Sequence, residues 1–547
     1  MRHIVRIGTA VLAVLAILFF LHKEYREEGG KRQAFLSVQV GDEVIQAWEN
    51  EVCYFFLPSG AVLSEVRLTA YSAAFLVSET GQDFRGGDSL EGLPVGEEIS
   101  CVKKEGNLPF ELMILQSENL PSLFLDTSSG SLEKIHADKE HEEKGAFRLW
   151  DEEGNVLFSL GVTSFSGRGN TTFAGYEKKP YSLELKEEAS LLGLPAGTEY
   201  VLFANASDPL LIRNDLSRRM EEVLGVEFAH RGRFVDLYIN EIYQGNYYLV
   251  DRMEIGENKI NILNMEGMMD LLYQQSNYEA IEVYETDTLK ARLLSHNPND
   301  ITGGYLLERE YGDRYEHEYD IIGSGFITEG KEHFVIKSPR YCSKEQVEYL
   351  QDYVNQAEAA IMAENGLHPE TGKSYQEYLD VNSFVRRYLV EEISKNYDAG
   401  VTSTFFYKKS EAEGGKLYFA PGWDYDMSWG NGVEWMEYHS NDPEGITELA
   451  FHEYASHWHT ALCSREEFSK LIKEIYEKEA SLFLEEVLGS ILDEYKELLT
   501  PSALMDHLRW QEELVKNSNY VEWEEGFIQL KEFIRMRKVY LDEAWGS

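Results

Sequence analysis

Alternation of apolar and polar residues predicts a small all-β domain in residues 34–118. The runs AFLSVQV, EVRLTAY and FELMILQ alternate with a period of two, and turn-forming clusters such as FRGGDS separate them. A period of two is typical of strands with one buried face. No catalytic grouping of side chains stands out in this region, so a spacer or adhesion role is favoured.

Mixed helix and strand patterns follow in residues 119–432. The segment GRFVDLYINEIYQGNYYLV contains two strand-like runs around Asn240 and Gly245, which predicts a hairpin. Ser343 and Gln346 have the spacing of a capping box that opens a helix. In this first helix, five apolar residues after the capping box have helical spacing: Val347, Leu350, Val354, Ala357 and Ile361. A second helix is expected over about 382–395.

Residues 433–547 are strongly helical in pattern, as in EEFSKLIKEIYEKEASLFLEEVLGSILDEYKELL. Apolar heptads are not sustained long enough for a coiled coil. We therefore expect a helical C-terminal lobe that belongs to the same catalytic unit as residues 119–432. The fold class predicted for the chain is α+β.

The N-terminal 33 residues have the pattern of a signal peptide or signal anchor. Arg2 and Arg6 precede an apolar run over residues 7–21, and charged residues then follow. No clear small-x-small cleavage site comes after the run, which favours an uncleaved membrane anchor. Since the basic flank stays in the cytoplasm, the remainder is expected to be extracytoplasmic, and secreted if the segment is cleaved.

Charge and cysteine content narrow the possible functions. The chain of 547 residues has 51 basic and 96 acidic side chains, a formal net charge of −45. This balance argues against general binding of nucleic-acid backbones, although local cations still permit a bound nucleotide. The four cysteines form no CxxC pair, which disfavours a structural zinc site. Cys53 and Cys101 could form a disulfide in an exported protein, but spacing alone does not decide it.

Two carboxylates stand close together in the stretch APGWDYDMSWGN. Asp424 and Asp426 follow a short apolar strand and lie among aromatic residues, which fits either a solvated turn or a metal site. The preceding runs, Thr404 to Lys408 and Lys416 to Ala420, predict an antiparallel hairpin. With Tyr407 opposite Lys416, the hairpin brings Asp398 close to the pair at 424 and 426.

Three carboxylates in this arrangement suit metal-dependent phosphoryl transfer. One aspartate, free of metal, orients and deprotonates a hydroxyl, while another holds Mg²⁺ against phosphates. Ser403, five positions after Asp398, is a further oxygen donor, weaker than the asparagine of ordinary kinases. A polar loop with solvated carboxylates remains the alternative.

The chain resembles the spore coat protein H (CotH) kinase family, atypical secreted protein kinases, over roughly residues 120–432. The resembling segments occur in the family's order: LPSLFLDT, GAFRLWDEEGNV, SGRGNTTFAGYEKKPYSLEL, DPLLIRNDLSRRM, VDLYINEIYQGNYYLV, GGYLLERE, FVIKSP, NYD and PGWDYDMSWGN. Glu241 stands where glycine is usual in the family.

The resemblance implies a distant two-lobed protein-kinase-like fold with ATP and Mg²⁺ or Mn²⁺ in the cleft. By position, Asp398 matches the catalytic aspartate and Asp424 the metal-binding aspartate. Asp426 is either a second metal ligand or a structural acceptor, and Ser403 takes the place of a further ligand.

Four other residues receive roles in nucleotide binding by the same resemblance. Trp423 matches an aromatic residue that stacks on adenine, a role that suits its flat face. Lys179 is the candidate for pairing with the phosphates, and Lys178 is its rival because adjacent strand residues point to opposite faces. Glu308 is expected to orient that lysine.

The predicted function is therefore ATP-dependent phosphorylation of Ser or Thr on extracytoplasmic proteins. The alternative is a catalytically degenerate, membrane-anchored protein that serves binding or coat and surface assembly, a reading favoured by Ser403. Expected partners are a protein substrate and the membrane, and no nucleic acid.

Overall fold

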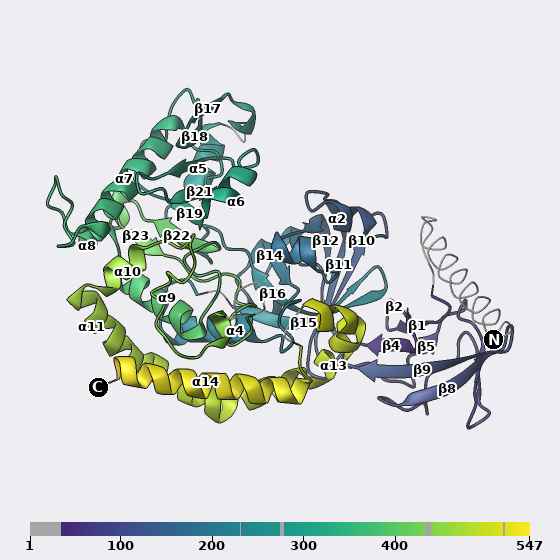
Figure 1. Cartoon of the computed structure of the whole chain (residues 1–547). Coiled ribbons are helices and arrows are strands. Elements are labelled where there is room, and N and C mark those ends of the chain that lie inside the picture. Colours follow the sequence, from purple (N-terminus) through teal and green to yellow (C-terminus); the bar gives the residue numbers. More distant parts are fainter. Residues whose placement is uncertain (1–33, 230, 274–277, 433–438, 518–519, 547) are drawn as a thin grey trace, which may run out of the picture.

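The computed structural model describes residues 34–229, 231–273, 278–432, 439–517 and 520–546. The predicted signal segment, with its apolar run at 7–21, lies outside these residues. None of the helices in the described ranges combines the length and apolar character needed to span a membrane. The architecture is α+β, with several sheets and a helical C-terminal region, as predicted (Figure 1).

Two antiparallel-rich sheets occupy residues 37–116. One has three strands in the order β2-β1-β5, and the other has six in the order β3-β4-β9-β8-β6-β7. Cys53 and Cys101 lie on strands that both flank β9, and both are buried free thiols. The strands are β1 Ser37–Val40, β2 Glu43–Gln46, β3 Trp48–Glu49, β4 Cys53–Leu57, β5 Arg67–Leu68, β6 Phe75–Val77, β7 Asp83–Phe84, β8 Glu98–Lys103 and β9 Leu108–Gln116.

A closed seven-stranded barrel follows, which the sequence analysis did not predict. Its strands run in the order β10-β11-β12-β13-β14-β16-β15, and the parallel pair of β10 with β15 closes it. Apolar side chains fill its interior, among them Leu123, Phe147 and Val235. The elements are β10 Ser122–Thr127, α2 Glu133–Ala137, β11 Glu143–Trp150, β12 Val156–Gly167, α3 Thr171–Gly175, β13 Tyr181–Ala189, β14 Gly197–Phe203, α4 Arg213–Val223, β15 Gly232–Ile239 and β16 Ile242–Asp251.

The predicted hairpin in the barrel is confirmed by β15 and β16. Its turn residues Asn240 and Glu241 have φ of 50° and 73°, the left-handed region that two-residue hairpin turns require. Glu241 accepts hydrogen bonds from the backbone and the side chain of Gln46, each of 2.8 Å. The contact with β2 helps to hold a conformation that usually needs glycine.

A second large sheet has seven antiparallel strands in the order β17-β18-β20-β21-β19-β22-β23. The predicted capping box of Ser343 and Gln346 is confirmed at the start of α7, and the second predicted helix corresponds to α9. The elements are α5 Met265–Leu272, β17 Val283–Thr286, β18 Leu289–Arg292, β19 Tyr305–Glu310, α6 Gly312–His317, β20 Gly325–Ile327, β21 His333–Ser338, α7 Lys344–Met362, α8 Tyr375–Tyr378, α9 Val381–Ser394, β22 Thr404–Lys408 and β23 Leu417–Phe419.

The β22–β23 hairpin forms, but the predicted register was wrong by two residues. Tyr407 pairs with Tyr418, not with Lys416. The connection after Tyr407 is longer than predicted, because it includes a 3₁₀ segment, Glu411–Glu413, which a capping box at Ser410 fixes. A shift of two residues leaves each side chain on its predicted face.

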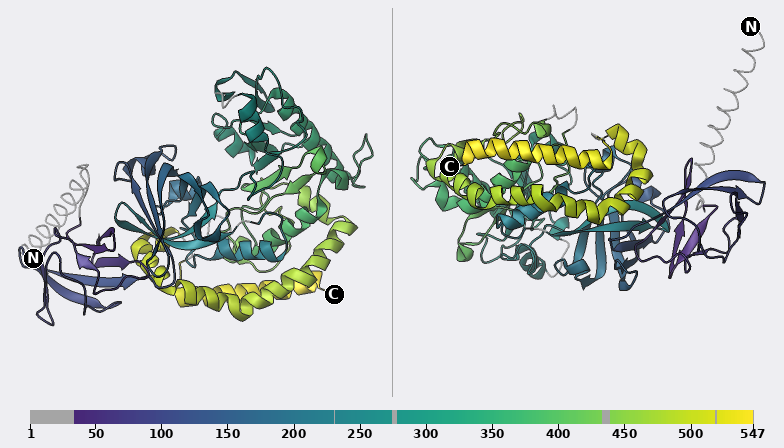
Figure 2. Two further views of the ribbon diagram at one scale, coloured as in Figure 1. Left: turned by 180° about the vertical axis from the view of Figure 1, so that it is seen from behind. Right: turned by 90° about the horizontal axis from the view of Figure 1, so that it is seen from below.

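The C-terminal helices run along one side of the molecule. From Glu466 to Asn517 the chain is almost continuously helical, and α14 lies beside this long stretch (Figure 2). Around Ser502, in its middle part, α13 packs against β16 of the barrel. The helices are α10 Trp458–Cys463, α11 Glu466–Ile475, α12 Ser481–Glu486, α13 Leu492–Asn517 and α14 Trp523–Trp545.

Candidate active site

A cavity of about 910 Å³, here called the main cavity, lies between the barrel and the seven-stranded sheet. The barrel contributes the bend after β12 and the end of β14, and the sheet contributes β19 and β21. The segment after β23 completes the wall. Six of the seven residues predicted for the site line this cavity: Glu308, Asp398, Ser403, Trp423, Asp424 and Asp426.

Asp398 lies in a tight turn between α9 and β22. Helix α9 ends at a left-handed Lys395, and the carbonyl of Asp398 accepts hydrogen bonds from the amides of Val401 and Thr402 at 3.0 and 3.1 Å. Ser403 follows with φ of 49°, so the chain turns sharply before the strand begins. This turn places the Asp398 carboxyl and the Ser403 hydroxyl at the main cavity.

Asp424 and Asp426 are held from the segment that follows β23. The amide of Tyr425, between them, donates to Asn214 Oδ1 at 2.9 Å, and the Tyr425 hydroxyl donates to Glu221 at 3.0 Å. Tyr425 is thereby buried away from the two carboxyls. Asp424 has φ of 73°, a conformation that costs free energy in a residue with a side chain and that recurs at functional sites.

Burial and mutual repulsion raise the pKa values of the three carboxyls. Burial and the nearby Asp426 raise the pKa of Asp398 to about 7. Burial and Asp398 raise the pKa of Asp424, while burial and Asp424 raise that of Asp426 well above its usual range. The Asp426 carboxyl also accepts a hydrogen bond from the Ser207 hydroxyl. Without a cation, these groups resist simultaneous ionisation.

The donor set suits a hard divalent cation. Among the described residues, no group of three or more His, Cys, Asp or Glu side chains has the arrangement of a metal centre. The two carboxyls of Asp424 and Asp426 nevertheless face one cavity, with the Ser403 hydroxyl on its wall. Mg²⁺ is typically bound by one or two carboxylates, with substrate phosphates and water as the other ligands.

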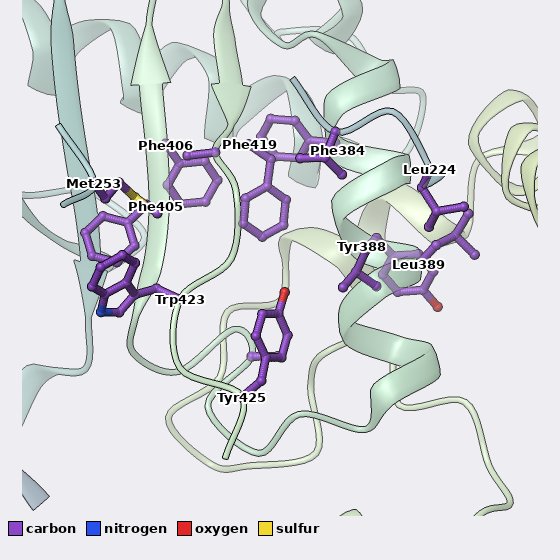
Figure 3. Packing of buried hydrophobic residues seen from close by; sticks show 14 of the residues in the cluster. Leu224, Met253, Phe384, Tyr388, Leu389, Phe405, Phe406, Phe419, Trp423 and Tyr425 are labelled. Atoms are coloured by element: carbon purple, nitrogen blue, oxygen red, sulfur yellow. The ribbon is translucent and has the colours of Figure 1, made fainter. Parts of the chain in front are cut away.

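Trp423 and Arg168 form an aromatic and cationic wall. Trp423 is 8% exposed, lies 5.0 Å from the ring of Phe203, and is seen beside Phe405 and Met253 in Figure 3. The guanidinium carbon of Arg168 is 5.1 Å from the Trp423 ring centroid. Burial lowers the pKa of Arg168 to about 10, and Asp424 opposes this shift, so the side chain stays cationic near pH 7.

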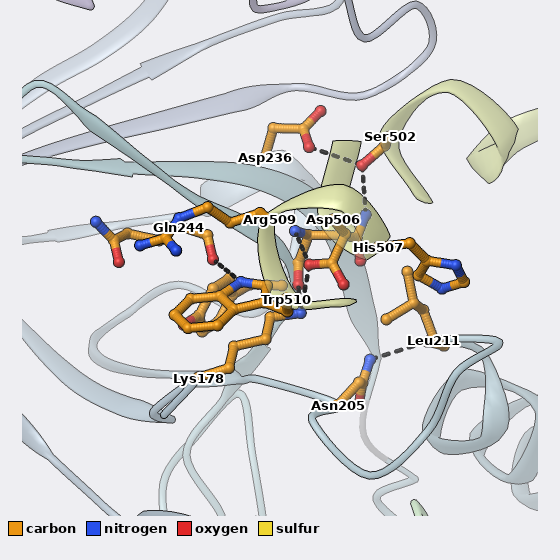
Figure 4. A network of polar contacts seen from close by, with 12 residues as sticks. Lys178, Asn205, Leu211, Asp236, Gln244, Ser502, Asp506, His507, Arg509 and Trp510 are labelled. Carbon is orange, nitrogen blue, oxygen red and sulfur yellow. Dashed lines mark hydrogen bonds and ion pairs between the residues drawn. The ribbon is translucent and has the colours of Figure 1, made fainter. Parts of the chain in front are cut away.

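Lys179, the predicted partner of the phosphates, is not at the cavity wall. Its ammonium donates to the carbonyl of Phe173 at 2.5 Å. Its rival Lys178 points toward α13, where it pairs with Asp506 at 2.5 Å and donates to the carbonyl of Asn246 at 2.8 Å (Figure 4). Neither lysine lines the main cavity in this structure, and α13, far away in sequence, engages Lys178.

Glu308 lies at the main cavity but pairs with a different lysine than expected. Lys337, on the adjacent strand β21, reaches Glu308 Oε2 at 2.9 Å. Arg314 of α6 also lines the cavity and donates to Thr402 Oγ1 at 2.7 Å. Sequence reasoning missed Arg168, Lys337 and Arg314 as cavity cations. The first two lie in GRGN and FVIKSP, so the basic residues of these segments were the available signal.

Comparison with known proteins gives one family. A search of curated proteins finds no match. The family model described as CotH kinase protein matches residues 165–541. This match begins inside the barrel, later than the resemblance in the sequence indicated, and continues through the C-terminal helices. Because it covers more than half of the 547 residues, the chain belongs to the CotH kinase protein family.

Proposed function

We propose that this protein is an ATP- and divalent-metal-dependent protein kinase that phosphorylates Ser or Thr of extracytoplasmic proteins. The observation that carries the proposal is the main cavity, which brings Asp398, Asp424 and Asp426 together with Trp423 and Arg168. Membership of the CotH kinase protein family supports a kinase-like function. The localisation depends on the predicted anchor at residues 7–21.

In the proposed function, the barrel and the seven-stranded sheet act as the two lobes of a kinase-like unit. The main cavity lies between them and is large enough for a nucleotide. Trp423 offers a ring face for adenine. Arg168 and Lys337 supply cations toward the phosphates, and Glu308 orients Lys337 through their ion pair.

Asp398 is the proposed base. It holds the substrate hydroxyl by a hydrogen bond and accepts its proton as the hydroxyl oxygen bonds to the terminal phosphorus of ATP, while the bond from that phosphorus to the bridging oxygen breaks and ADP leaves. Burial, the largest cause of the raised pKa of Asp398, makes this carboxylate a better proton acceptor than an exposed one. Asp424 and Asp426 would hold Mg²⁺ or Mn²⁺, and Ser403 is a further oxygen donor. The bound metal would neutralise phosphate charge during transfer.

Phosphate transfer by the full-length chain tests the proposal. Labelled ATP with Mg²⁺ or Mn²⁺ is expected to label protein, and Asp398→Asn should abolish labelling. Asp352→Asn is the matched control, because Asp352 is an exposed carboxylate on α7 whose side-chain partner is Gln356. Full activity in Asp398→Asn would refute its role as the base.

A binding protein without chemistry is the second candidate, and Ser403 favours it. A neutral hydroxyl is a weaker Mg²⁺ ligand than an amide or carboxylate oxygen in a fixed geometry. In this case, ATP with metal should raise the melting temperature of the wild type but not of Asp424→Ala. Such a shift without any phosphate transfer would support the binding protein.

A further inference from the structure

The turn at residues 398–402, which carries Asp398, is tightly packed and leads into a strained residue. Gly400 has φ of 72°, and a Cβ atom there would lie 2.6 Å from the carbonyl oxygen of Leu449. Ser403, directly after the turn, has φ of 49°. A left-handed conformation in a residue with a side chain costs free energy and persists where the surrounding structure holds it. The contacts around this turn therefore show what keeps Asp398 in place.

Arg309, on β19, holds the backbone of the turn. Its Nη1 donates to the carbonyls of Gly400 and Val401 at 2.5 and 2.8 Å. Its Nε donates to Glu332 Oε2 at 2.5 Å, and its Nη2 donates to the carbonyl of Tyr454 at 2.8 Å. Because every nitrogen of this buried guanidinium has an acceptor, the side chain is fixed and in turn fixes the two carbonyls of the turn.

Thr402 is held at the end of the turn by two side chains that also pair with each other. Its hydroxyl donates to Glu310 Oε2 at 2.6 Å and accepts from Arg314 Nη1 at 2.7 Å. Arg314 Nη2 and Glu310 Oε1 lie 3.3 Å apart. The amide of Thr402 donates to the carbonyl of Asp398 at 3.1 Å, so these side chains are joined to the backbone of the proposed base.

We propose that Thr402 and Arg309 are positioning residues, which hold Asp398 against the hydroxyl that it deprotonates. This inference rests on the proposed function. The groups proposed to contact ATP come from other segments: the bend after β12, strand β21 and the segment after β23. Thr402 and Arg309 therefore govern how fast phosphate is transferred and not how tightly ATP binds. A displacement of about 1 Å is enough to lower a rate about 10²-fold.

Replacement of Thr402 by valine and by serine tests the inference in the full-length protein. Valine has nearly the same shape without the hydroxyl, and Glu310 and Arg314 still pair with each other, so the variant should fold. Initial rates of phosphate transfer from labelled ATP with Mn²⁺ to dephosphorylated casein, over a range of ATP concentrations, separate kcat from KM. Thr402→Val should lower kcat about 10²-fold and leave the KM for ATP unchanged, whereas Thr402→Ser should retain the wild-type kcat.

Thr302→Val is the matched control. The Thr302 hydroxyl donates to Asp300 Oδ1 at 2.6 Å and accepts from the amide of Glu411 at 3.0 Å. Thr302 precedes the opposite end of β19, so its replacement should lower the melting temperature as Thr402→Val does, without changing kcat. The rise in melting temperature caused by ATP with Mn²⁺ should be the same in both variants and in the wild type.

A wild-type kcat in Thr402→Val would overturn the inference. An equal loss of kcat in Thr302→Val would also overturn it, because the effect would then be general destabilisation, and so would a loss in Thr402→Ser as large as in the valine variant. If circular dichroism shows that Thr402→Val does not fold, Arg309→Lys takes its place, since a lysine ammonium cannot span all the acceptors that Arg309 holds. An unchanged kcat in Arg309→Lys would then overturn the inference.

Failure of the proposed function is recognised in the wild type, before any variant is compared. If the wild type transfers no phosphate, the proposed function fails and the positioning role falls with it. If the wild type is active and Thr402→Val is equally active, only the positioning role is lost.

Discussion

Arg168 and Trp423 lie against one another in the wall of the main cavity, with the guanidinium carbon 5.1 Å from the ring centroid. The arginine comes from the bend after β12 of the barrel, and the tryptophan comes from the segment after β23. Asp424 is the residue next to Trp423, and its charge acts on Arg168. One contact therefore connects the barrel, the aromatic wall and the proposed metal site.

Arg168→Gln is expected to raise the KM for ATP. Hydrogen bonds to charged groups contribute about 1.5–3 kcal/mol, which corresponds to roughly tenfold or more in affinity. Steady-state kinetics with varied ATP measures the effect. Arg535→Gln, at an exposed arginine on α14, controls for the loss of charge alone and should leave KM unchanged. An unaltered KM in Arg168→Gln would remove this residue from the nucleotide site.

Lys337 and Lys179 are expected to behave differently when replaced. Lys337→Met removes the cation that pairs with Glu308 at the main cavity and should lower kcat/KM by about 10²-fold, as loss of one group that stabilises the transition state does. Lys179→Met should change the rate by no more than about twofold, because its ammonium bonds to the Phe173 carbonyl outside the cavity. If Lys179→Met lowered kcat/KM more than Lys337→Met, Lys179 would be the partner of the phosphates.

The pair of Lys178 and Asp506 should govern stability more than catalysis. Both side chains are at most 2% exposed, and they join the barrel to α13. Lys178→Met leaves a buried carboxylate without its cation and should reduce the free energy of unfolding by about 3–5 kcal/mol. Urea denaturation measures this loss. Lys104→Met, which breaks an exposed pair with Asp83, should cost no more than about 1 kcal/mol.

The buried ring of His459 is expected to make stability depend on pH. Burial lowers the pKa of His459 to about 3, compared with about 6.5 in the unfolded chain. Between these values the unfolded state binds the extra proton, so the free energy of unfolding falls as pH drops from 6.5 toward 3. Above pH 6.5 His459 is neutral in both states, so it does not make the free energy of unfolding depend on pH.

His459→Phe should make that slope shallower, since the ring stacks among Phe384, Tyr388 and Phe419 and a phenyl group fits there. Thermal unfolding at several pH values measures the slope. The same replacement at exposed His317 is the control and should leave the slope unchanged. Identical slopes in wild type and His459→Phe would contradict the expected role of burial.

The sequence correctly predicted those helices and strands whose signals lie within a few neighbouring residues. The strand expected at Thr404 to Lys408 coincides with β22, and Ser343 caps α7 as predicted, because alternation and capping depend on residues a few positions apart. The predicted register of the hairpin was wrong by two residues, yet Asp398 still reaches the cavity of Asp424 and Asp426. An even shift keeps side chains on the same face.

Long-range contacts explain what the sequence did not reveal. The barrel closes by pairing Ser122 with Asp236, and no local period records that contact. Lys178 is drawn to Asp506, which lies 328 residues away, so the choice between Lys178 and Lys179 needed the position of α13.

The two carboxylates of the WDYD stretch should differ in their dependence on metal. Asp426 is 7% exposed and already accepts a hydrogen bond from Ser207, whereas Asp424 is less buried. Asp424→Asn should therefore abolish transfer, and Asp426→Asn should weaken it modestly. Activity is measured while Mn²⁺ is titrated against each variant. A hard cation loses affinity with each charged oxygen removed, so equal and sharply raised Mn²⁺ requirements in the two variants would mean that both aspartates are ligands. That result would disprove the dominant role of Asp424.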